Sequence, residues 1–181
     1  MRSGVATVTD RLHALEERLP VLEAVEAVKQ LKYRYWRACD DKDPVVFREC
    51  FVDDAKLDYG ALGSFDSPEP ILQAFVAIAL EVADGTYVIR DSHHGYQPTI
   101  DISGATSASP TATGLWAFRI RQVNLRDGTE SVSAGEYRDE YVVRDGEWKI
   151  KSSAFRSIWS IRRPFGEETI VAGEMPPAGD K

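Results

Sequence analysis

The fold is decided by residues 111–161, which read TATGLWAFRIRQVNLRDGTESVSAGEYRDEYVVRDGEWKIKSSAFRSIWSI. Long runs of alternating apolar and polar residues are separated there by two Asp-Gly pairs, Asp127-Gly128 and Asp145-Gly146. An Asp-Gly pair between such runs is the strongest short-range signal of a β-hairpin. The segment therefore predicts three consecutive antiparallel strands, at Thr111–Leu125, Ser131–Val143 and Glu147–Ile161.

Working outward, a fourth strand is expected at His93–Ile102, with a polar loop at Ser103–Pro110 behind it. Apolar residues three or four positions apart predict a long first helix over Thr9–Cys39, which Pro20 should break or bend. Two later helices each begin with a capping residue followed by proline. They are expected from Asp43-Pro44 through Phe51 and from Ser67-Pro68 to about Val82, the latter with Ile71, Phe75, Ile78 and Ala79 inward, and a short strand lies between them at Ala55–Tyr59.

Helices followed by long antiparallel strands indicate an α+β fold, in which a curved sheet wraps around the helices as a cone-shaped barrel. The concave side of such a sheet is only partly filled and is the natural place for a pocket. We expect one domain over residues 1–181, with a core at about 10–162 and a C-terminal extension at 163–181 that ends irregularly.

The composition is that of an ordinary globular protein. Hydrophobic residues make up 43% of the 181 residues, charged residues 28%, and the formal net charge is -7. This acidity, without a run of Lys or Arg, disfavours binding to nucleic acid or to an anionic membrane. No segment has the roughly 18 consecutive apolar residues of a membrane span. We expect a cytoplasmic protein in which Cys39 and Cys50 are reduced and buried.

Strand periodicity assigns residues to the two faces of the sheet. In the strand after Gly114 the inward face is apolar, with Trp116, Phe118 and Ile120. In the last strand a strict alternation places Ser152, Ala154 and Arg156 inward, and Phe155 and Trp159 outward. An inward arginine needs an acceptor, because an unpaired buried charge costs several kcal/mol. Two interpretations of Arg156 stay open: a structural pair with a carboxylate on the adjacent strand, such as Asp139, or binding of a substrate oxygen in the pocket.

The candidate chemistry centres on a histidine. His93 and His94 are adjacent at the start of a strand, so one of them should face the pocket. An imidazole in an apolar cavity is a natural general base, and it needs a carboxylate to orient it. Asp40 is the candidate, because a carboxylate at a helix C-terminus is disfavoured by the helix dipole unless a cation faces it. Alternatively, Asp40 simply ends the helix in solvent.

No metal-ligand spacing, phosphate loop or nucleophile elbow is present in the sequence. We therefore expect no cofactor and no metal. The remaining possibilities are acid–base chemistry carried by side chains, or ligand binding without chemistry.

Several stretches carry a resemblance to a known family. The run EAVKQLKYRYWRACDDKD (26–43) and the later stretches HHGYQPTIDI, TATGLWAF, GEYRDEYVVRDGEWKI and KSSAFRSIW resemble the SnoaL-like family of the nuclear-transport-factor-2-like superfamily. The pattern is most similar to that of bile acid 7α-dehydratase, and more distantly to scytalone dehydratase and lindane dehydrochlorinase. The resemblance covers about residues 10–162. It departs from the bile acid enzyme at Tyr96, Arg119 and Ile120, so it does not predict a bile acid substrate.

The resemblance implies roles for four residues. It places the catalytic tyrosine on Tyr35, the aspartate on Asp40, the histidine on His93 and a pocket arginine on Arg156. It thereby selects His93 over His94. The implied activity is a cofactor-independent dehydratase that eliminates water from a bulky, mostly apolar ring ketone of steroid or polyketide type. The side chains expected around such a substrate are Trp36, Tyr96, Trp116, Phe118, Tyr137, Ser152 and Ala154.

Two alternatives use the same pocket. A polyketide cyclase or ketosteroid-type isomerase would redirect the enolate instead of expelling water. A non-catalytic protein would only bind a small hydrophobic ligand, and would not need Asp40 and His93 within hydrogen-bonding distance. The expected partners are thus a small hydrophobic substrate and further copies of the chain. An apolar outer patch at Phe155 and Trp159 favours a homo-oligomer, and the resemblance favours a trimer over a dimer.

Overall fold

The computed structural model describes residues 7–173, 175 and 177. Its main element is a six-stranded sheet with the order β2-β1-β8-β7-β6-β5. Neighbouring strands are antiparallel, except that β1 runs parallel to β8. The strands are β1 (Phe51–Asp58), β2 (Ser64–Phe65), β5 (Ile89–Ser103), β6 (Thr111–Asn124), β7 (Thr129–Arg144) and β8 (Glu147–Pro164), and β3 (Val82–Ala83) pairs with β4 (Thr86–Tyr87) in a separate ribbon.

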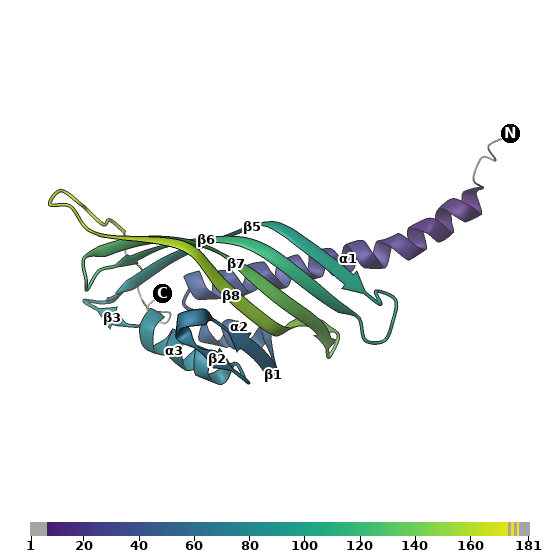
Figure 1. Cartoon of the computed structure of the whole chain (residues 1–181), viewed down its shortest axis with the longest axis horizontal. Helices are drawn as coiled ribbons and strands as arrows, with labels where there is room; N and C mark the ends of the chain where they lie inside the picture. The colour runs from purple at the N-terminus through teal and green to yellow at the C-terminus, as the bar shows by residue number, and fades with distance from the viewer. Residues whose placement is uncertain (1–6, 174, 176, 178–181) are drawn as a thin grey trace.

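The long strands β5 to β8 curve around the helices, as Figure 1 shows. The second half of α1 (Val8–Asp40) runs along the concave side of the sheet, and α2 (Pro44–Glu49) and α3 (Glu69–Ala79) lie below it with β1 and β2. A short 3₁₀ turn at Gly60–Leu62 connects β1 to β2. This arrangement confirms the predicted α+β barrel, its long strands and its Asp-Gly hairpins. The short elements β2, β3 and β4 have no counterpart in the prediction.

Helix α1 is continuous, so the predicted break at Pro20 is wrong. It begins with a capping box, in which the Thr7 side chain accepts from the Asp10 N–H and Asp10 accepts from the Thr7 N–H. Pro20 removes one hydrogen bond, to the carbonyl of Glu16, in a stretch where side chains are exposed. Water can donate a hydrogen bond to that carbonyl instead, and the helix therefore tolerates the proline.

Strand β8 contains an extra residue that reverses its faces. Tyr141 of β7 pairs with Ile150, but Glu140 pairs with Ser152, so Lys151 is left as a β-bulge. Because side chains alternate with a period of two, one inserted residue turns every later side chain to the other face. Phe155 therefore faces inward, and the outward position predicted for it is wrong.

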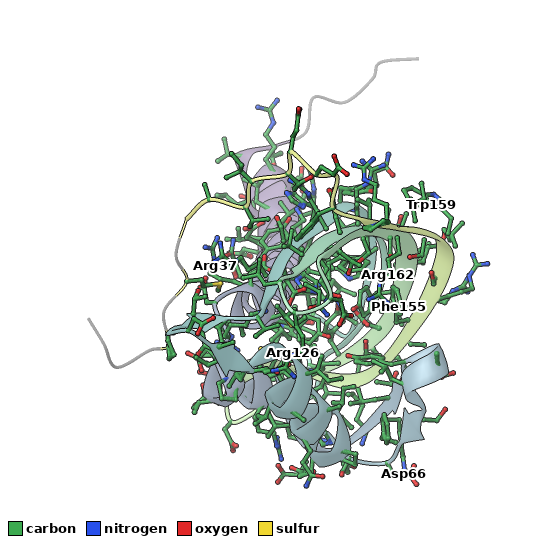
Figure 2. All side chains as sticks on the ribbon, turned by 90° about the vertical axis from the view of Figure 1, so that its left-hand side faces the viewer. Arg37, Asp66, Arg126, Phe155, Trp159 and Arg162 are labelled. Atoms are coloured by element: carbon green, nitrogen blue, oxygen red, sulfur yellow. The ribbon has the colours of Figure 1, made fainter. Side chains whose placement is uncertain are left out.

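A second shift between Ala134 and Gly135 restores the original alternation, so Trp159 lies on the outer face as predicted. There it is 41% exposed and contacts the Arg119 guanidinium. Figure 2 shows Phe155 on the inner side of the curved sheet and Trp159 at its rim.

The C-terminal extension returns to the start of β5. The Tyr87 N–H donates to the Met175 carbonyl (3.0 Å), and Arg90 donates to the Gly173 carbonyl (2.6 Å). In the part of the chain described, no helix is both long and apolar enough to cross a membrane. Both cysteines are buried and free, as expected.

Candidate active site

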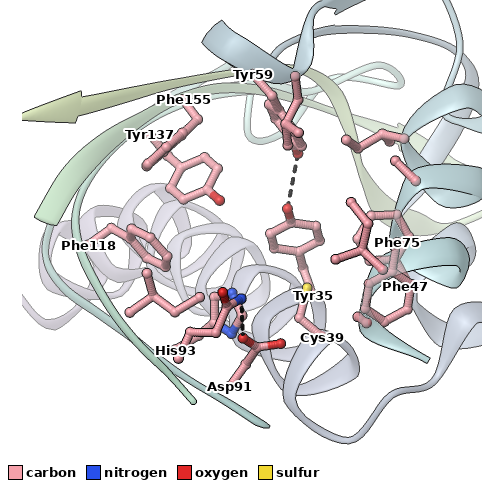
Figure 3. Close-up of a pocket in the computed structure, with 17 residues that line it drawn as sticks. Tyr35, Cys39, Phe47, Tyr59, Phe75, Asp91, His93, Phe118, Tyr137 and Phe155 are labelled. Atoms are coloured by element: carbon pink, nitrogen blue, oxygen red, sulfur yellow. Dashed lines mark hydrogen bonds between the residues drawn. The ribbon is translucent and has the colours of Figure 1, made fainter. Parts of the chain in front are cut away.

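A cavity of about 250 Å³ opens between the concave side of the sheet and the helices (Figure 3). Its walls are mainly apolar, and aromatic rings stand on two sides of it. Phe47 and Phe75 stack with ring centroids 4.9 Å apart, and Tyr137 lies 5.0 Å from Phe155. Helix α3 lines the cavity with the four residues that the sequence predicts to point inward. The lining residues are Tyr35, Cys39, Phe47, Tyr59, Leu62, Ile71, Ala74, Phe75, Ile78, Ala79, Asp91, His93, Phe118, Ile120, Gln122, Tyr137 and Phe155.

His93 and Asp40 are in direct contact at the wall of this cavity. The Nδ1 atom of His93 lies against Oδ1 of Asp40, and the backbone N–H of His93 donates to both carboxylate oxygens, at 3.1 and 3.0 Å. The His93 side chain is 11% exposed and that of Asp40 is 28% exposed. Since Asp40 occupies Nδ1, Nε2 is the ring nitrogen that remains for a ligand in the cavity.

The fold brings the two residues together through an open strand edge. Strand β5 is an edge strand of the sheet, so its N–H groups point alternately toward β6 and away from the sheet. Asp40, at the end of α1, accepts the free N–H of His93. Gly95 allows this approach, because a Cβ on it would come within 1.8 Å of the Trp36 ring. His94 has the opposite orientation and is exposed.

Three buried phenols occupy another part of the cavity. The hydroxyl of Tyr35 lies 3.0 Å from that of Tyr59 and points away from His93, as Figure 3 shows. Burial raises the pKa of Tyr35, Tyr59 and Tyr137 above the ordinary value of a phenol. All three hydroxyls are therefore protonated at neutral pH and can donate hydrogen bonds. Burial also raises the pKa of Cys39, so its thiol is neutral and a poor nucleophile.

Tyr35 and Asp40 share one unbroken helix, although their side chains diverge by roughly 140°. Tyr35 faces the cavity directly, whereas Asp40 reaches it through His93. The helix does not have to unwind near Cys39 for both residues to serve one site.

A second carboxylate lines the cavity two positions before His93 on the same face of β5. One oxygen of Asp91 pairs with Lys42 at 2.5 Å, and the other accepts from Gln122 at 2.8 Å. Lys42 has no exposed side-chain surface, and it sits in the left-handed region (φ 60°) just after α1 ends. Figure 3 shows Asp91 beside His93. This polar group gives the apolar cavity a place to hold a hydrogen-bond donor of a ligand.

A second ion pair lies behind the cavity. Lys32 of α1 and Asp139 of β7 are 2.8 Å apart, and neither side chain has exposed surface. Asp139 also accepts hydrogen bonds from the hydroxyls of Tyr141 and Ser153, both at 2.7 Å. The Lys32 ammonium lies 3.8 Å from the centre of the Tyr137 ring. The pair thus supports the cavity wall without lining it.

Not all predicted site residues lie in the cavity. Tyr35, His93, Phe118 and Tyr137 line it, and Asp40 contacts His93. Trp36 and Trp116 are buried in the core behind the lining, where the Trp116 N–H donates to the Tyr141 hydroxyl at 2.9 Å. Tyr96 faces outward, 39% exposed, because it pairs with outward-facing Ala117. The predicted cavity positions of Trp36, Tyr96 and Trp116 are therefore wrong.

The bulge at Lys151 removes three more residues from the cavity. Ser152, Ala154 and Arg156 face outward, opposite to their predicted orientation. The Arg156 side chain is 68% exposed and pairs with Glu136 at 2.9 Å. Arg156 thus forms a structural pair on the adjacent strand, as one interpretation held, but its partner is Glu136 and not Asp139, which pairs with Lys32. The other interpretation, an arginine that binds a substrate oxygen, does not agree with the structure, because Arg156 does not line the cavity.

Sequence patterns missed Tyr59, Asp91, Gln122 and Phe155 as lining residues. Asp91 and Gln122 were within reach of the alternation rule, because they share the inward parity of His93 and Ile120. Tyr59 was also within that rule, since it ends the predicted strand Ala55–Tyr59 and shares the parity of buried Ala55 and Leu57. Phe155 lies beyond a bulge, where the alternation assigns it to the wrong face. Among the described residues, no group of three or more His, Cys, Asp or Glu side chains is placed to hold a metal ion.

Comparison with known proteins agrees with this architecture. Residues 20–154 match the family described as the SnoaL-like domain. A proposed scytalone dehydratase from Novosphingobium aromaticivorans is 19% identical, with 90% of this chain and 98% of that chain covered and a TM-score of 0.68. A hexachlorocyclohexane dehydrochlorinase from Novosphingobium barchaimii is 18% identical (86% and 99% covered, TM-score 0.66).

The protein ActVI-ORFA from Streptomyces coelicolor has the same fold at 14% identity, with 75% of this chain and 98% of that chain covered and a TM-score of 0.57. At these identities the likeness between the structures concerns the fold. The family match covers most of the chain, from within α1 to within β8. The chain therefore belongs to the SnoaL-like family, with the cone-shaped barrel of the nuclear-transport-factor-2-like superfamily.

Proposed function

We propose that the protein is a cofactor-independent lyase that eliminates water from a β-hydroxy ketone on a hydrophobic ring skeleton, with His93 as general base. The observation that carries the proposal is the imidazole at the wall of an apolar cavity with its Nδ1 held by Asp40. Such a pair orients the ring and stabilises the imidazolium that forms when Nε2 accepts a proton. The family and two of its structural neighbours, a proposed dehydratase and a dehydrochlorinase, are consistent with elimination chemistry.

The chemistry balances with the groups at hand. Nε2 of His93 takes the proton from the carbon beside the carbonyl, and the electrons of that C–H bond form the new C=C bond. The C–O bond to the β-hydroxyl breaks, and the departing oxygen takes the proton back from the imidazolium and leaves as water. The Tyr35–Tyr59 pair supplies a donor for the carbonyl oxygen, on which negative charge develops: one hydroxyl donates to the other, and the second O–H of the pair remains free. Arg156 lies outside the cavity and has no part in this proposal.

The cavity also bears on the substrate. Its volume of about 250 Å³ is at or below the low end of the range for drug-sized ligands. This favours a small ring ketone over a four-ring steroid. The Asp91 carboxylate, held by Lys42 and Gln122, provides an acceptor for a second hydroxyl on the substrate.

The experiment is a mass-spectrometric screen of β-hydroxy ketones with the wild-type protein. We expect a product lighter by one water. His93→Ala should lower that rate roughly 10²- to 10⁴-fold, the usual contribution of a general base. His94→Ala is the matched control, because it removes the adjacent but exposed imidazole and should leave the rate unchanged. Full turnover by a folded His93→Ala protein would falsify the mechanism.

An isomerase or cyclase is the second candidate. The observation in its favour is that several protonated groups share one cavity with His93, so an enolate has more than one proton donor available. Product mass separates the candidates, because isomerisation and simple cyclisation retain the water. A pure ligand-binding role agrees less well with the contact between Asp40 and His93, which binding alone does not need.

A further inference from the structure

The first half of α1 projects beyond the barrel, as Figure 1 shows, and carries an apolar face that the rest of the described chain leaves open. Five side chains form this face, spaced alternately four and three positions apart. Each is more than half exposed. We call them the apolar stripe: Val8 (74%), Leu12 (56%), Leu15 (58%), Leu19 (54%) and Leu22 (59%).

The barrel cannot cover the apolar stripe. At 100° per residue on an ideal helix, the stripe lies roughly 180° around the axis from the side that α1 buries against the sheet. That buried side includes Val28, Leu31 and Tyr35. The apolar residues of α1 therefore form two separate faces, one for the barrel's own core and one directed away from it.

The spacing of the stripe is that of a coiled-coil seam. Alternating steps of three and four residues give an average repeat of 3.5, which keeps a seam facing a partner helix. Large apolar side chains that are exposed in this pattern indicate a partner helix with the same repeat.

The charges beside the stripe identify that partner. Arg11 and Arg18 stand on one flank, and Glu16 and Glu23 stand on the other. In a parallel pair of such helices, each residue of the first flank faces the residue five positions later on the partner. Arg11 would meet Glu16, and Arg18 would meet Glu23, in both directions. In an antiparallel pair, arginine would meet arginine and glutamate would meet glutamate.

From this complementarity we infer that the apolar stripe binds the same stripe of a second copy of the chain, in parallel orientation. The pairing ends after Leu22, because Glu26 and Gln30 continue the same face of the helix and two Glu26 carboxylates would repel each other. Because the stripe faces away from the side of α1 that packs on the sheet, the two barrels would lie on the outer sides of the helix pair. A membrane surface is a poorer partner, because residues 8–26 hold Asp10, Glu16, Glu17, Glu23 and Glu26 against only Arg11 and Arg18.

Charge exchange tests the pairing in the full-length protein. Arg11→Glu/Arg18→Glu makes both flanks acidic, and Glu16→Arg/Glu23→Arg makes both basic. By sedimentation velocity, the self-association constant of each variant should fall roughly 10-fold or more, since four favourable pairs become repulsive. An equimolar mixture of the two variants should regain association. Glu17→Arg, on the outer side of the helix, is the matched control and should associate like wild type.

Cross-linking tests the orientation. Leu22→Cys places a thiol next to its own copy only in a parallel pair, and the native cysteines are buried. Mild oxidation should give a disulfide-linked dimer, and much less of it in the Arg11→Glu/Arg18→Glu background.

The inference is overturned by a wild-type protein that stays monomeric at all concentrations tested. It is equally overturned by an assembly whose mass neither charge exchange changes, or by co-sedimentation with phosphatidylserine vesicles. Circular dichroism of every variant checks that the variant is folded, so that a loss of association is not caused by unfolding.

Discussion

Helix α1 carries one member of each of two ion pairs, and these differ in what surrounds them. Lys32 and Asp139 are sealed, with 0% exposure for both side chains, and Asp139 has two further hydrogen-bond donors. Asp40 and His93 retain 28% and 11% exposure, and His93 is the residue that engages the Asp40 carboxylate. The sealed pair exposes no atom with which a ligand could form a hydrogen bond. The open pair keeps one ring nitrogen for the cavity, and this difference separates a structural pair from a reactive one.

The largest effect should come from breaking the sealed pair. Lys32→Met leaves the Asp139 charge buried without its counter-ion, and we expect unfolding to become about 3–5 kcal/mol easier. Urea denaturation followed by circular dichroism measures this loss. The double variant Lys32→Met/Asp139→Asn removes the orphaned charge and should recover part of the stability. Equal stability of the two variants would show that the charge is not the cause.

The pH dependence of the same pair has a defined sign. Burial lowers the pKa of Lys32 below its ordinary value of 10.5. The unfolded chain therefore holds this proton more tightly than the folded one, and stability contributed by this group rises with pH between the lowered and the ordinary pKa. Below that window the lysine is charged in both states and the contribution is constant. Denaturation at several alkaline pH values should show this rise in the wild type and not in Lys32→Met.

Breaking the open pair should affect the rate instead of the fold. Asp40→Asn keeps the size of the side chain but removes the charge that stabilises the imidazolium of His93. We expect the rate of dehydration to fall roughly 10²-fold, with a midpoint of unfolding close to that of wild type. Asp41→Asn, at the next position and exposed, is the matched control. Equal losses of rate in both variants would contradict the assignment.

The phenols test how far the reactive region extends from His93. Tyr35→Phe removes one donor but keeps the ring in its aromatic packing against Phe47 and Phe51. If Tyr35 stabilises the developing oxyanion, the rate should fall about 10- to 10²-fold, as for a lost oxyanion-hole donor. Tyr87→Phe is a control for the loss of a buried phenol outside the cavity. An unchanged rate would leave Tyr59 or Tyr137 as the donor.

Much of this organisation follows from the sequence wherever periodicity is unbroken. Strand β6 pairs with β7 without a register shift, and the inward positions of Phe118 and Ile120 were predicted correctly. The inward positions predicted for helix α3 were also correct, since all four residues line the cavity. Asp40 was identified because a carboxylate at a helix C-terminus needs compensation, and the edge of β5 provides it through the His93 N–H.

The predictions failed where a tertiary contact changes the alternation. The bulge at Lys151 carries no composition signal, since Lys-Ser-Ser reads as continuous strand. Because of that one extra residue, Phe155 faces the cavity, and Ala154, which the alternation predicts to be inward, faces outward. Trp36 and Trp116 were misplaced for another reason: an inward direction does not distinguish the lining of a cavity from the core behind it.

The smallest effect should come from Arg156, and it bears most directly on the bulge. Its ion pair with Glu136 is on the outer face, so Arg156→Ala should change the rate of dehydration less than about 2-fold and the stability by less than about 0.5 kcal/mol. The hydrogen bond from Arg156 holds the pKa of Glu136 below its usual value, and the pKa should therefore rise in the variant. Carbon-13 NMR titration of the glutamate carboxyls measures this shift. A large loss of rate with an unchanged Glu136 titration would mean that Arg156 points into the cavity and that β8 has no bulge at Lys151.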